Sequence, residues 1–310
     1  MDKKISVIIP VKNDEKRIIS CLDAVINQTI SPFEIIVVDG HSSDDTVKNA
    51  LTYHVNVFFE DYGTVGGARQ VGVENAQGIF IAFTDSDCIP EKNWLENLLK
   101  EFEDDIVGVG GGIKNIGSGI WEKSISLALD TFLGSANSVQ DRVLKKKQFV
   151  RSISGCNSLY RRKDLIDIGG FNVTYKFNED TDINLRLSKK GKILYTSEAI
   201  VHHNQQRNLI QFCKRMFAFG FGRGKNHLID LQIIPPVSLI FVFATVFFNP
   251  MIFFVLMGLY ITLIISYSTK ITIETKKIEY LITIPLVFFI EHSSYSAGFW
   301  WGMLKSLAIN

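Results

Sequence analysis

The first 230 residues predict a Rossmann-like α/β domain, in which helices cover both faces of a mostly parallel sheet. Short runs rich in Val and Ile alternate there with segments of helical periodicity. This alternation is typical of parallel sheets, because parallel strands need a crossover connection between them. From residue 231 onward, long uncharged apolar runs replace the mixed composition. We therefore expect two domains, an α/β domain at 1–230 and a transmembrane region at 231–310.

The predicted elements alternate regularly over the first hundred residues and less regularly afterwards. Strands are expected at 5–11, 34–38, 55–59, 79–84, 107–113, 150–160 and 199–203. Helices are expected at 15–27, 44–51, 66–76, 91–102, 119–133, 179–189 and 209–221. Because crossovers are right-handed, the segments that follow the first four strands should meet at one edge of the sheet, where α/β proteins bind ligands.

The apolar region contains about 35 residues without a charge, at 233–267, and a second apolar stretch at 280–304. One membrane-spanning helix needs only about 20 residues, and Asn249-Pro250 divides the first run near its middle. A hairpin over 233–267 would return the lysines of 268–279 to the side that carries the basic residues Arg207, Lys214, Arg215, Arg223 and Lys225. The positive-inside rule favours this hairpin, with three crossings in all. One long kinked helix, with two crossings, is the alternative.

Composition and cysteine spacing restrict the class of protein. The formal net charge of +1 gives no basis for a nucleic-acid partner. The four cysteines, Cys21, Cys88, Cys156 and Cys213, are far apart and form no CxxC pair. This spacing argues against a disulfide framework and against a cysteine-based zinc site. The N-terminus shows no signal-peptide pattern, so a cytoplasmic catalytic domain is expected.

Six short motifs follow one another in the order typical of one enzyme family. They are SVIIPVKN at 6–13, IVVDGHSSDDT at 36–46, GGARQVG at 66–72, FTDSD at 83–87, GGFN at 169–172 and NEDTD at 178–182. Together they resemble the inverting family 2 glycosyltransferases, which have the GT-A fold, and here we expect the domain to be membrane-anchored. The resemblance covers about residues 4–225. A lone D-x-D is a weak signal, whereas six motifs in this order are specific.

The resemblance implies a divalent cation, Mn²⁺ or Mg²⁺, near Asp85-Ser86-Asp87. Such a cation acts as a Lewis acid on the diphosphate that leaves a nucleotide-sugar, and it prefers oxygen ligands. Asp87 is the main predicted ligand, and Asp85 is placed nearer the ribose or bound through water. His202 is a further predicted ligand, with His203 as the alternative. For either histidine, a purely structural role fits equally well.

The resemblance also implies roles in donor binding and in proton transfer. The residues expected to bind the donor are Pro10, Lys12, Asp39, Arg69, Asp85 and Ser86. Asp39 would accept a hydrogen bond from the base, and Arg69 would meet phosphate or ribose unless it lies on an exposed helix surface. Asp180 is the predicted catalytic base, with Glu179 beside it to tune it or to bind the acceptor. Two acidic residues can also simply favour the start of a helix.

These expectations describe a hexosyltransferase of the cell membrane, multi-pass, with its catalytic domain in the cytoplasm. It would transfer a sugar from a UDP- or GDP-linked donor to a lipid-linked or cell-envelope glycan acceptor held near membrane lipid. A polyprenyl-phosphate sugar synthase is the alternative within the class. A non-catalytic sugar-nucleotide-binding membrane protein is the alternative of another class, and it is disfavoured because Asp85, Asp87 and Asp180 are all present.

Overall fold

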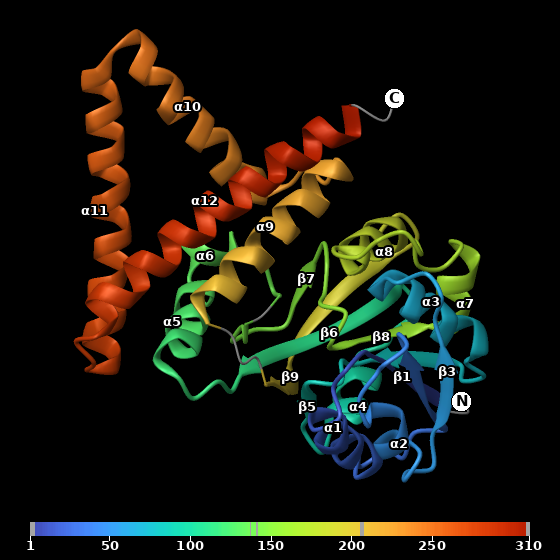
Figure 1. Ribbon diagram of the computed structural model, residues 1–310. Coiled ribbons are helices and arrows are strands. Elements are labelled where there is room, and N and C mark those ends of the chain that lie inside the picture. The colour runs from blue at the N-terminus through green and yellow to red at the C-terminus, as the bar shows by residue number, and fades with distance from the viewer. Residues whose placement is uncertain (1–3, 137, 141, 205–207, 308–310) are drawn as a thin grey trace. The chain divides into compact units, whose positions relative to one another are not determined.

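The computed structural model describes residues 4–136, 138–140, 142–204 and 208–307 (Figure 1). Arg207, one of the basic residues named above, lies outside this range. The chain divides into two compact units, Met1–Ile116 with Ser138–Gln205, and Gly117–Asn137 with Gln206–Asn310. The first unit contains the sheet and the second contains the apolar helices. The predicted boundary at residue 230 does not coincide with this division, because two more segments pack with the apolar helices.

Among the described residues, nine strands form one mixed sheet in the first unit. The strand order is β3-β2-β1-β4-β8-β6-β9-β5, and β7 pairs with β9. β1 pairs in parallel with β2 and β4, and β2 pairs in parallel with β3, as the alternation of strands and helices predicts. The strands are β1 (Ile5–Val11), β2 (Glu34–Asp39), β3 (Asn56–Phe59), β4 (Phe80–Phe83), β5 (Cys88–Pro90), β6 (Ile106–Asn115), β7 (Gln148–Val150), β8 (Ser158–Arg161) and β9 (Lys192–His203).

Helices cover both faces of the sheet, and each face has its own hydrophobic core (Figure 1). Side chains alternate along β1, so that Val7 and Ile9 enter one core and Ile8 enters the other. The first core contains residues of α1 and α4, and the second contains residues of α3, α7 and α8. The helices of this unit are α1 (Arg17–Ile26), α2 (Thr46–Ala50), α3 (Val65–Asn75), α4 (Trp94–Leu99), α7 (Arg162–Asp167) and α8 (Glu179–Leu187).

The structure differs from the predicted elements around the middle of the chain. The strand expected at 150–160 is interrupted, because β7 ends at Val150 and β8 begins only at Ser158. Between them, the buried amide of Asn157 donates to the carbonyls of Gly112 and Ala199 at 2.9 and 3.0 Å, and this segment joins β6 and β9 through a side chain. β5 was not predicted, and its three residues pair antiparallel with the end of β9.

The second unit consists of helices. They are α5 (Ile120–Leu129), α6 (Phe132–Ser135), α9 (Leu209–Lys225), the 3₁₀ helix η1 (Leu231–Ile233), α10 (Ile234–Phe248), α11 (Pro250–Thr275) and α12 (Tyr280–Leu307). The helix expected at 119–133 is divided, because Thr131 ends the first part and caps α6 by accepting from the Gly134 N–H. α9 and α12 approach closely at glycines, where a Cβ on Gly220 would lie 2.0 Å from the Tyr295 carbonyl oxygen. This close packing explains why α9 belongs with the apolar helices.

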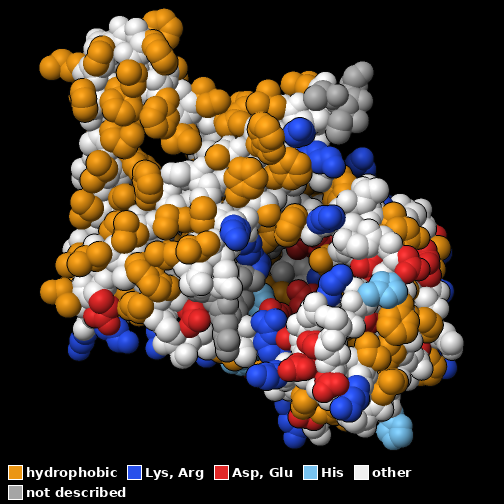
Figure 2. Space-filling model, viewed as in Figure 1, with side chains coloured by type: hydrophobic (Ala, Val, Ile, Leu, Met, Phe, Trp, Pro, Cys, Tyr) orange, Lys and Arg blue, Asp and Glu red, His pale blue; other side chains and the backbone are white. Residues whose placement is uncertain are grey.

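Two helices in the described part of the chain are long and apolar enough to cross a membrane, Leu231–Phe248 and Pro250–Thr275. They carry many of the hydrophobic side chains exposed on the face shown in Figure 2. Asn249 separates them and caps α11 by accepting from the Met251 N–H, as the Asn249-Pro250 pair predicts. α11 continues to Thr275, so the loop expected at 268–279 is shorter. α12 is not among these spans, since Glu291 and His292 interrupt its apolar sequence. The number of crossings stays a prediction.

Candidate active site

The polar segments that follow β1, β2 and β4 leave the sheet at the same edge. The strand register fixes this arrangement, because Val11 pairs with Asp39 and Ile8 pairs with Phe83. The sequence 84–87 therefore starts beside the last residues of β1 and runs toward the segment that follows this strand. This is the edge at which the sequence predicts the donor and the cation.

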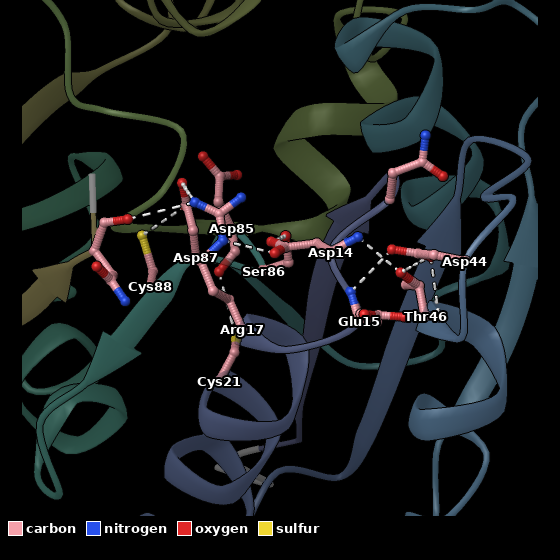
Figure 3. Close-up of polar contacts among 12 residues, drawn as sticks. Asp14, Glu15, Arg17, Cys21, Asp44, Thr46, Asp85, Ser86, Asp87 and Cys88 are labelled. Carbon is pink, nitrogen blue, oxygen red and sulfur yellow. Dashed lines mark hydrogen bonds and ion pairs between the residues drawn. The ribbon is translucent and has the colours of Figure 1, made fainter. Parts of the chain in front are cut away.

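A hydrogen-bonded chain holds the Asp85-Ser86-Asp87 turn against the first helix (Figure 3). Asp14, which is buried, accepts from the Ser86 hydroxyl at 2.6 Å and from Arg17 Nε at 2.6 Å. Arg17 Nη1 lies 3.4 Å from Asp87 Oδ2. Ser86, predicted to contact the donor, thus bonds to Asp14 in this structure. Asp14 and Arg17 were not predicted as site residues, although Asp14 lies in the loop after β1 and Arg17 begins α1.

Arg69 links the two acidic motifs. It lies on α3 and is 3% exposed, and its Nη2 donates to Asp85 Oδ1 at 2.8 Å. Its Nη1 pairs with Glu179 at the start of α8. The guanidinium packs against Gly155, where a Cβ would lie 2.4 Å from Nη1, so that position has no room for a side chain. The alternative of an exposed Arg69 on a helix surface is wrong, and the guanidinium is directed at carboxylates of the protein.

Asp180 lies next to this pair and accepts hydrogen bonds on both of its carboxylate oxygens. Oδ1 accepts from its neighbour, the Thr181 N–H, at 2.7 Å. Oδ2 accepts from the Gly155 N–H at 3.2 Å and from Gln140 Nε2 at 3.3 Å. Desolvation raises the pKa of Asp180, although the charge of Arg69 and the two backbone N–H groups oppose this rise. A raised pKa makes the ionised carboxylate a better proton acceptor.

The structure separates the two adjacent histidines. His203 is buried, and its Nε2 lies 3.2 Å from Asp87 Oδ1. His202 projects to the other side of β9, where its Nε2 lies 2.9 Å from Glu91 Oε1. The predicted ligand His202 therefore does not lie beside Asp87. The alternative ligand, His203, does. Alternation from the buried Ala199 and Val201 places His203 on their side of the strand.

The predicted nucleoside residues line the ends of β1 and β2. Asp39 is buried and accepts from both the N–H and the hydroxyl of Ser42, so in this structure it shapes the loop after β2. Pro10 is half-buried and Lys12 is exposed. Glu60, just after the end of β3, is buried beside this loop and accepts from the Gly63 N–H at 2.9 Å. It is one of the polar residues that the strand order predicts at this edge of the sheet.

The fold and this arrangement define a GT-A glycosyltransferase. The family model "Glycosyl transferase family 2" matches residues 6–169, which is more than half of the 310 residues. The chain therefore belongs to glycosyltransferase family 2, and it is a transferase.

Relatives along most of the chain are also glycosyltransferases. A dolichyl N-acetyl-alpha-D-glucosaminyl phosphate 3-beta-D-2,3-diacetamido-2,3-dideoxy-beta-D-glucuronosyltransferase of Methanococcus voltae is 25% identical over 324 residues, 97% of each chain. The glycosyltransferase AglE of Haloferax volcanii is 27% identical over 238 residues, 73% of this chain and 75% of that protein.

Solved structures share the fold at low sequence identity. S. aureus TarS 1-349, solved with UDP-GlcNAc, matches with a TM-score of 0.52 and 18% identity over 97% of this chain and 92% of that one. GalNAc-T7, solved with UDP, GalNAc and Mn²⁺, matches with a TM-score of 0.53 and 15% identity over 74% of this chain and 52% of that one. At these identities the similarity concerns the fold.

Proposed function

We propose that this glycosyltransferase moves a sugar, with inversion, from a nucleotide-sugar to a lipid-linked saccharide at a membrane, and that the reaction depends on a divalent cation. The observation that carries the proposal is the position of Arg69 between Asp85 and Glu179. This buried ion pair joins the acidic turn after β4 to the residue that precedes Asp180. This network supports the proposal because it connects Asp85, proposed for the donor side, to the neighbour of Asp180, the proposed base.

The residues that would hold the cation are Asp85, Asp87 and His203. Carboxylate oxygens suit Mn²⁺ or Mg²⁺, and Mg²⁺ commonly takes only one or two protein carboxylates together with substrate phosphates. The 3.2 Å separation of His203 Nε2 and Asp87 Oδ1 brings two such ligand atoms together. When bound, the cation would stabilise the negative charge of the departing diphosphate. Arg69 holds Asp85, and Arg17 holds Asp87.

Asp180 is the proposed base. Its carboxylate would take the proton from the acceptor hydroxyl while the hydroxyl oxygen attacks the anomeric carbon on the face opposite the leaving phosphate, which inverts that centre. The N–H groups of Gly155 and Thr181 fix the orientation of this carboxylate. Glu179 balances the charge of Arg69, so that Arg69 does not neutralise Asp180 directly.

Two features support a lipid-linked acceptor. The first is the pair of apolar helices, Leu231–Phe248 and Pro250–Thr275. The second is the full-length relative from Methanococcus voltae, whose name describes a dolichyl phosphate that already carries a sugar. This name favours extension of a lipid-linked saccharide over direct charging of a polyprenyl phosphate. Lys214, Arg215, Arg223 and Lys225 precede the first apolar helix, which would place the catalytic domain in the cytoplasm.

The decisive experiment is a donor and acceptor screen with the full chain in detergent. Thermal stabilisation by UDP-, GDP- and dTDP-sugars with Mn²⁺ identifies the donor. Transfer of the labelled sugar is then measured to three acceptors, a bare polyprenyl phosphate, a polyprenyl phosphate that carries N-acetylglucosamine, and a soluble sugar. We expect transfer to the second acceptor. Transfer to the bare lipid phosphate would instead identify a polyprenyl-phosphate sugar synthase. Stabilisation without transfer to any acceptor would favour a non-catalytic protein.

A further inference from the structure

Three side chains that are far apart in the sequence offer soft ligand atoms at one buried point. The sulfurs of Cys88 and Cys156 and a ring nitrogen of His203 all lie within 4.8 Å of one another, and all three residues are buried. Cys88 lies on β5, Cys156 precedes β8, and His203 ends β9. The register pairs Cys88 directly with His203. The cysteine spacing argued against such a cluster, but the sheet assembles it from strands that are not neighbours in the sequence.

We propose that Cys88, Cys156 and His203 form a binding site for a thiophilic divalent cation of the Zn²⁺ type, next to the catalytic cation and sharing His203 with it. Two thiolates and an imidazole are typical zinc ligands, whereas Mg²⁺ and Mn²⁺ prefer oxygen. The ligand atoms of a tetrahedral zinc site lie about 3.3–3.8 Å apart. The three atoms here are within 4.8 Å, so small side-chain shifts bring them to coordinating distance.

Asp87 offers a carboxylate oxygen next to these three atoms as a fourth ligand. Its Oδ1 lies 3.8 Å from Cys88 Sγ and 3.2 Å from His203 Nε2. Asp87, His203 and the two thiols therefore make a Cys₂HisAsp set, which suits tetrahedral zinc. The hard cation of the proposed reaction would use the same two residues, Asp87 and His203. The two sites compete for these two residues.

Occupation of the thiol site would inhibit transfer, a consequence that rests on the proposed function. The cation would withdraw Asp87 and His203 from the catalytic cation. The bound cation would also restrict the movement of the segment that contains Cys156. In this segment the Gly155 N–H donates to Asp180 at 3.2 Å. Asp87 is thus the sequence neighbour of Cys88, and Gly155, which donates to Asp180, is the neighbour of Cys156. A protein with this site loses activity when free zinc rises, even with Mn²⁺ in excess.

The binding test uses Cd²⁺, because cadmium–thiolate bonds give an ultraviolet charge-transfer band that carboxylates do not produce. The reduced full chain, in detergent and without donor or acceptor, is titrated with Cd²⁺. We expect the band to saturate at one cation per chain, and we expect Cys88→Ser and Cys156→Ser to weaken it strongly. Cys213→Ser is the matched control, because Cys213 Sγ bonds to Ser294 in the helical unit, and this variant should keep the band. No band in the wild type, or a full band in Cys156→Ser, would overturn the site.

The inhibition test measures transfer at saturating Mn²⁺ while free Zn²⁺ is raised, with each variant normalised to its own zinc-free rate. We expect Cys156→Ser to need at least about tenfold more zinc for half-inhibition, the scale on which loss of one partner weakens a metal site. Cys213→Ser should behave as the wild type. Equal zinc sensitivity of Cys156→Ser and wild type would overturn the inhibitory role. The cadmium titration needs no turnover, so it decides the site even if the proposed transfer reaction fails.

Discussion

Arg69 on α3 donates to Asp85 across 2.8 Å while it also pairs with Glu179 on α8, and its side chain is only 3% exposed. One buried cation therefore sets the position of both the donor-side carboxylate and the acidic pair that contains Asp180. Without it, Glu179 would be a buried carboxylate with no partner and would repel Asp85, whose side chain is 34% exposed. Arg69 is a positioning residue for the proposed reaction.

This relationship predicts that Arg69→Lys impairs turnover. A lysine carries a single point charge and cannot donate in two directions with the fixed geometry of a guanidinium. We expect kcat/KM to fall on the order of 10²-fold, the size of loss that misplaced catalytic groups cause. Steady-state transfer kinetics measure it. Arg186→Lys is the matched control, because Arg186 pairs with Asp182 on the same helix α8 away from this network, and its kcat/KM should stay near that of the wild type.

Removing the charge altogether should also cost stability. Arg69→Met leaves Glu179, which is 6% exposed, without its partner. Deleting one member of a buried ion pair typically costs about 3 to 5 kcal/mol. A thermal melt of the full chain in detergent should show a lower Tm for Arg69→Met than for Arg69→Lys. An unchanged Tm in Arg69→Met would contradict the structural role of the bridge.

The parts of the fold that local patterns determine were predictable. β1, β2, β3 and β4 follow from alternation and from the crossovers between them, and Asp85 follows from its place after β4. The direction of Arg69 was not predictable, because α8 approaches it from about 110 residues away, as the Arg69–Glu179 pair shows. Local periodicity carries no information on such a partner.

The choice between His202 and His203 illustrates the same limit. Alternation places His203 on the side of Ala199 and Val201, but it does not say which side of the strand faces Asp87. The face that His203 occupies is fixed by its pairing with Cys88 on β5, a three-residue strand that no local pattern marks. The cluster of Cys88, Cys156 and His203 depends on the same pairing, which the spacing of the cysteines in the sequence does not reveal.

The histidines provide a matched pair of variants for the cation site. His203→Ala should raise the Mn²⁺ concentration for half-maximal activity by about 10- to 100-fold, as loss of metal-site partners does. His202→Ala removes a side chain that bonds to Glu91 and should leave this concentration nearly unchanged. Activity of the wild type should also stop in EDTA and return with Mn²⁺ or Mg²⁺. Full activity in chelator, or a larger effect of His202→Ala, would contradict the assignment.

The helical unit offers a test that is independent of catalysis. Gly220→Ala places a methyl group 2.0 Å from the Tyr295 carbonyl oxygen of α12, so α9 must move away. Overpacking of this kind typically costs about 1 to 3 kcal/mol, and we expect a lower Tm. Gly258→Ala on α11 is the control, because no atom lies within 4 Å of its added Cβ. This control should melt at or slightly above the wild-type temperature, since Ala is the better helix former.

Asp180→Asn tests whether this carboxylate is the base and whether it is also needed for binding of the donor. Loss of a general base typically lowers the rate by about 10²- to 10⁴-fold, so transfer should nearly stop while thermal stabilisation by the donor persists. In the wild type, protonation of Asp180 should produce the acid limb of kcat/KM at a pH above the ordinary value of 3.8, because desolvation raises this pKa. Full turnover by Asp180→Asn would remove Asp180 from the role of base.

The stability of the wild type relative to the same variant depends on pH with a definite sign. A raised pKa means that the folded protein binds the Asp180 proton more tightly than the unfolded chain does. The contribution of this carboxyl to the free energy of unfolding therefore falls as pH rises from its unfolded value of 3.8 through the raised folded value, and it returns on acidification. Asn does not titrate, so the Tm of Asp180→Asn relative to wild type should increase across that window. A relative Tm that decreases there would show that the folded state favours the ionised carboxylate.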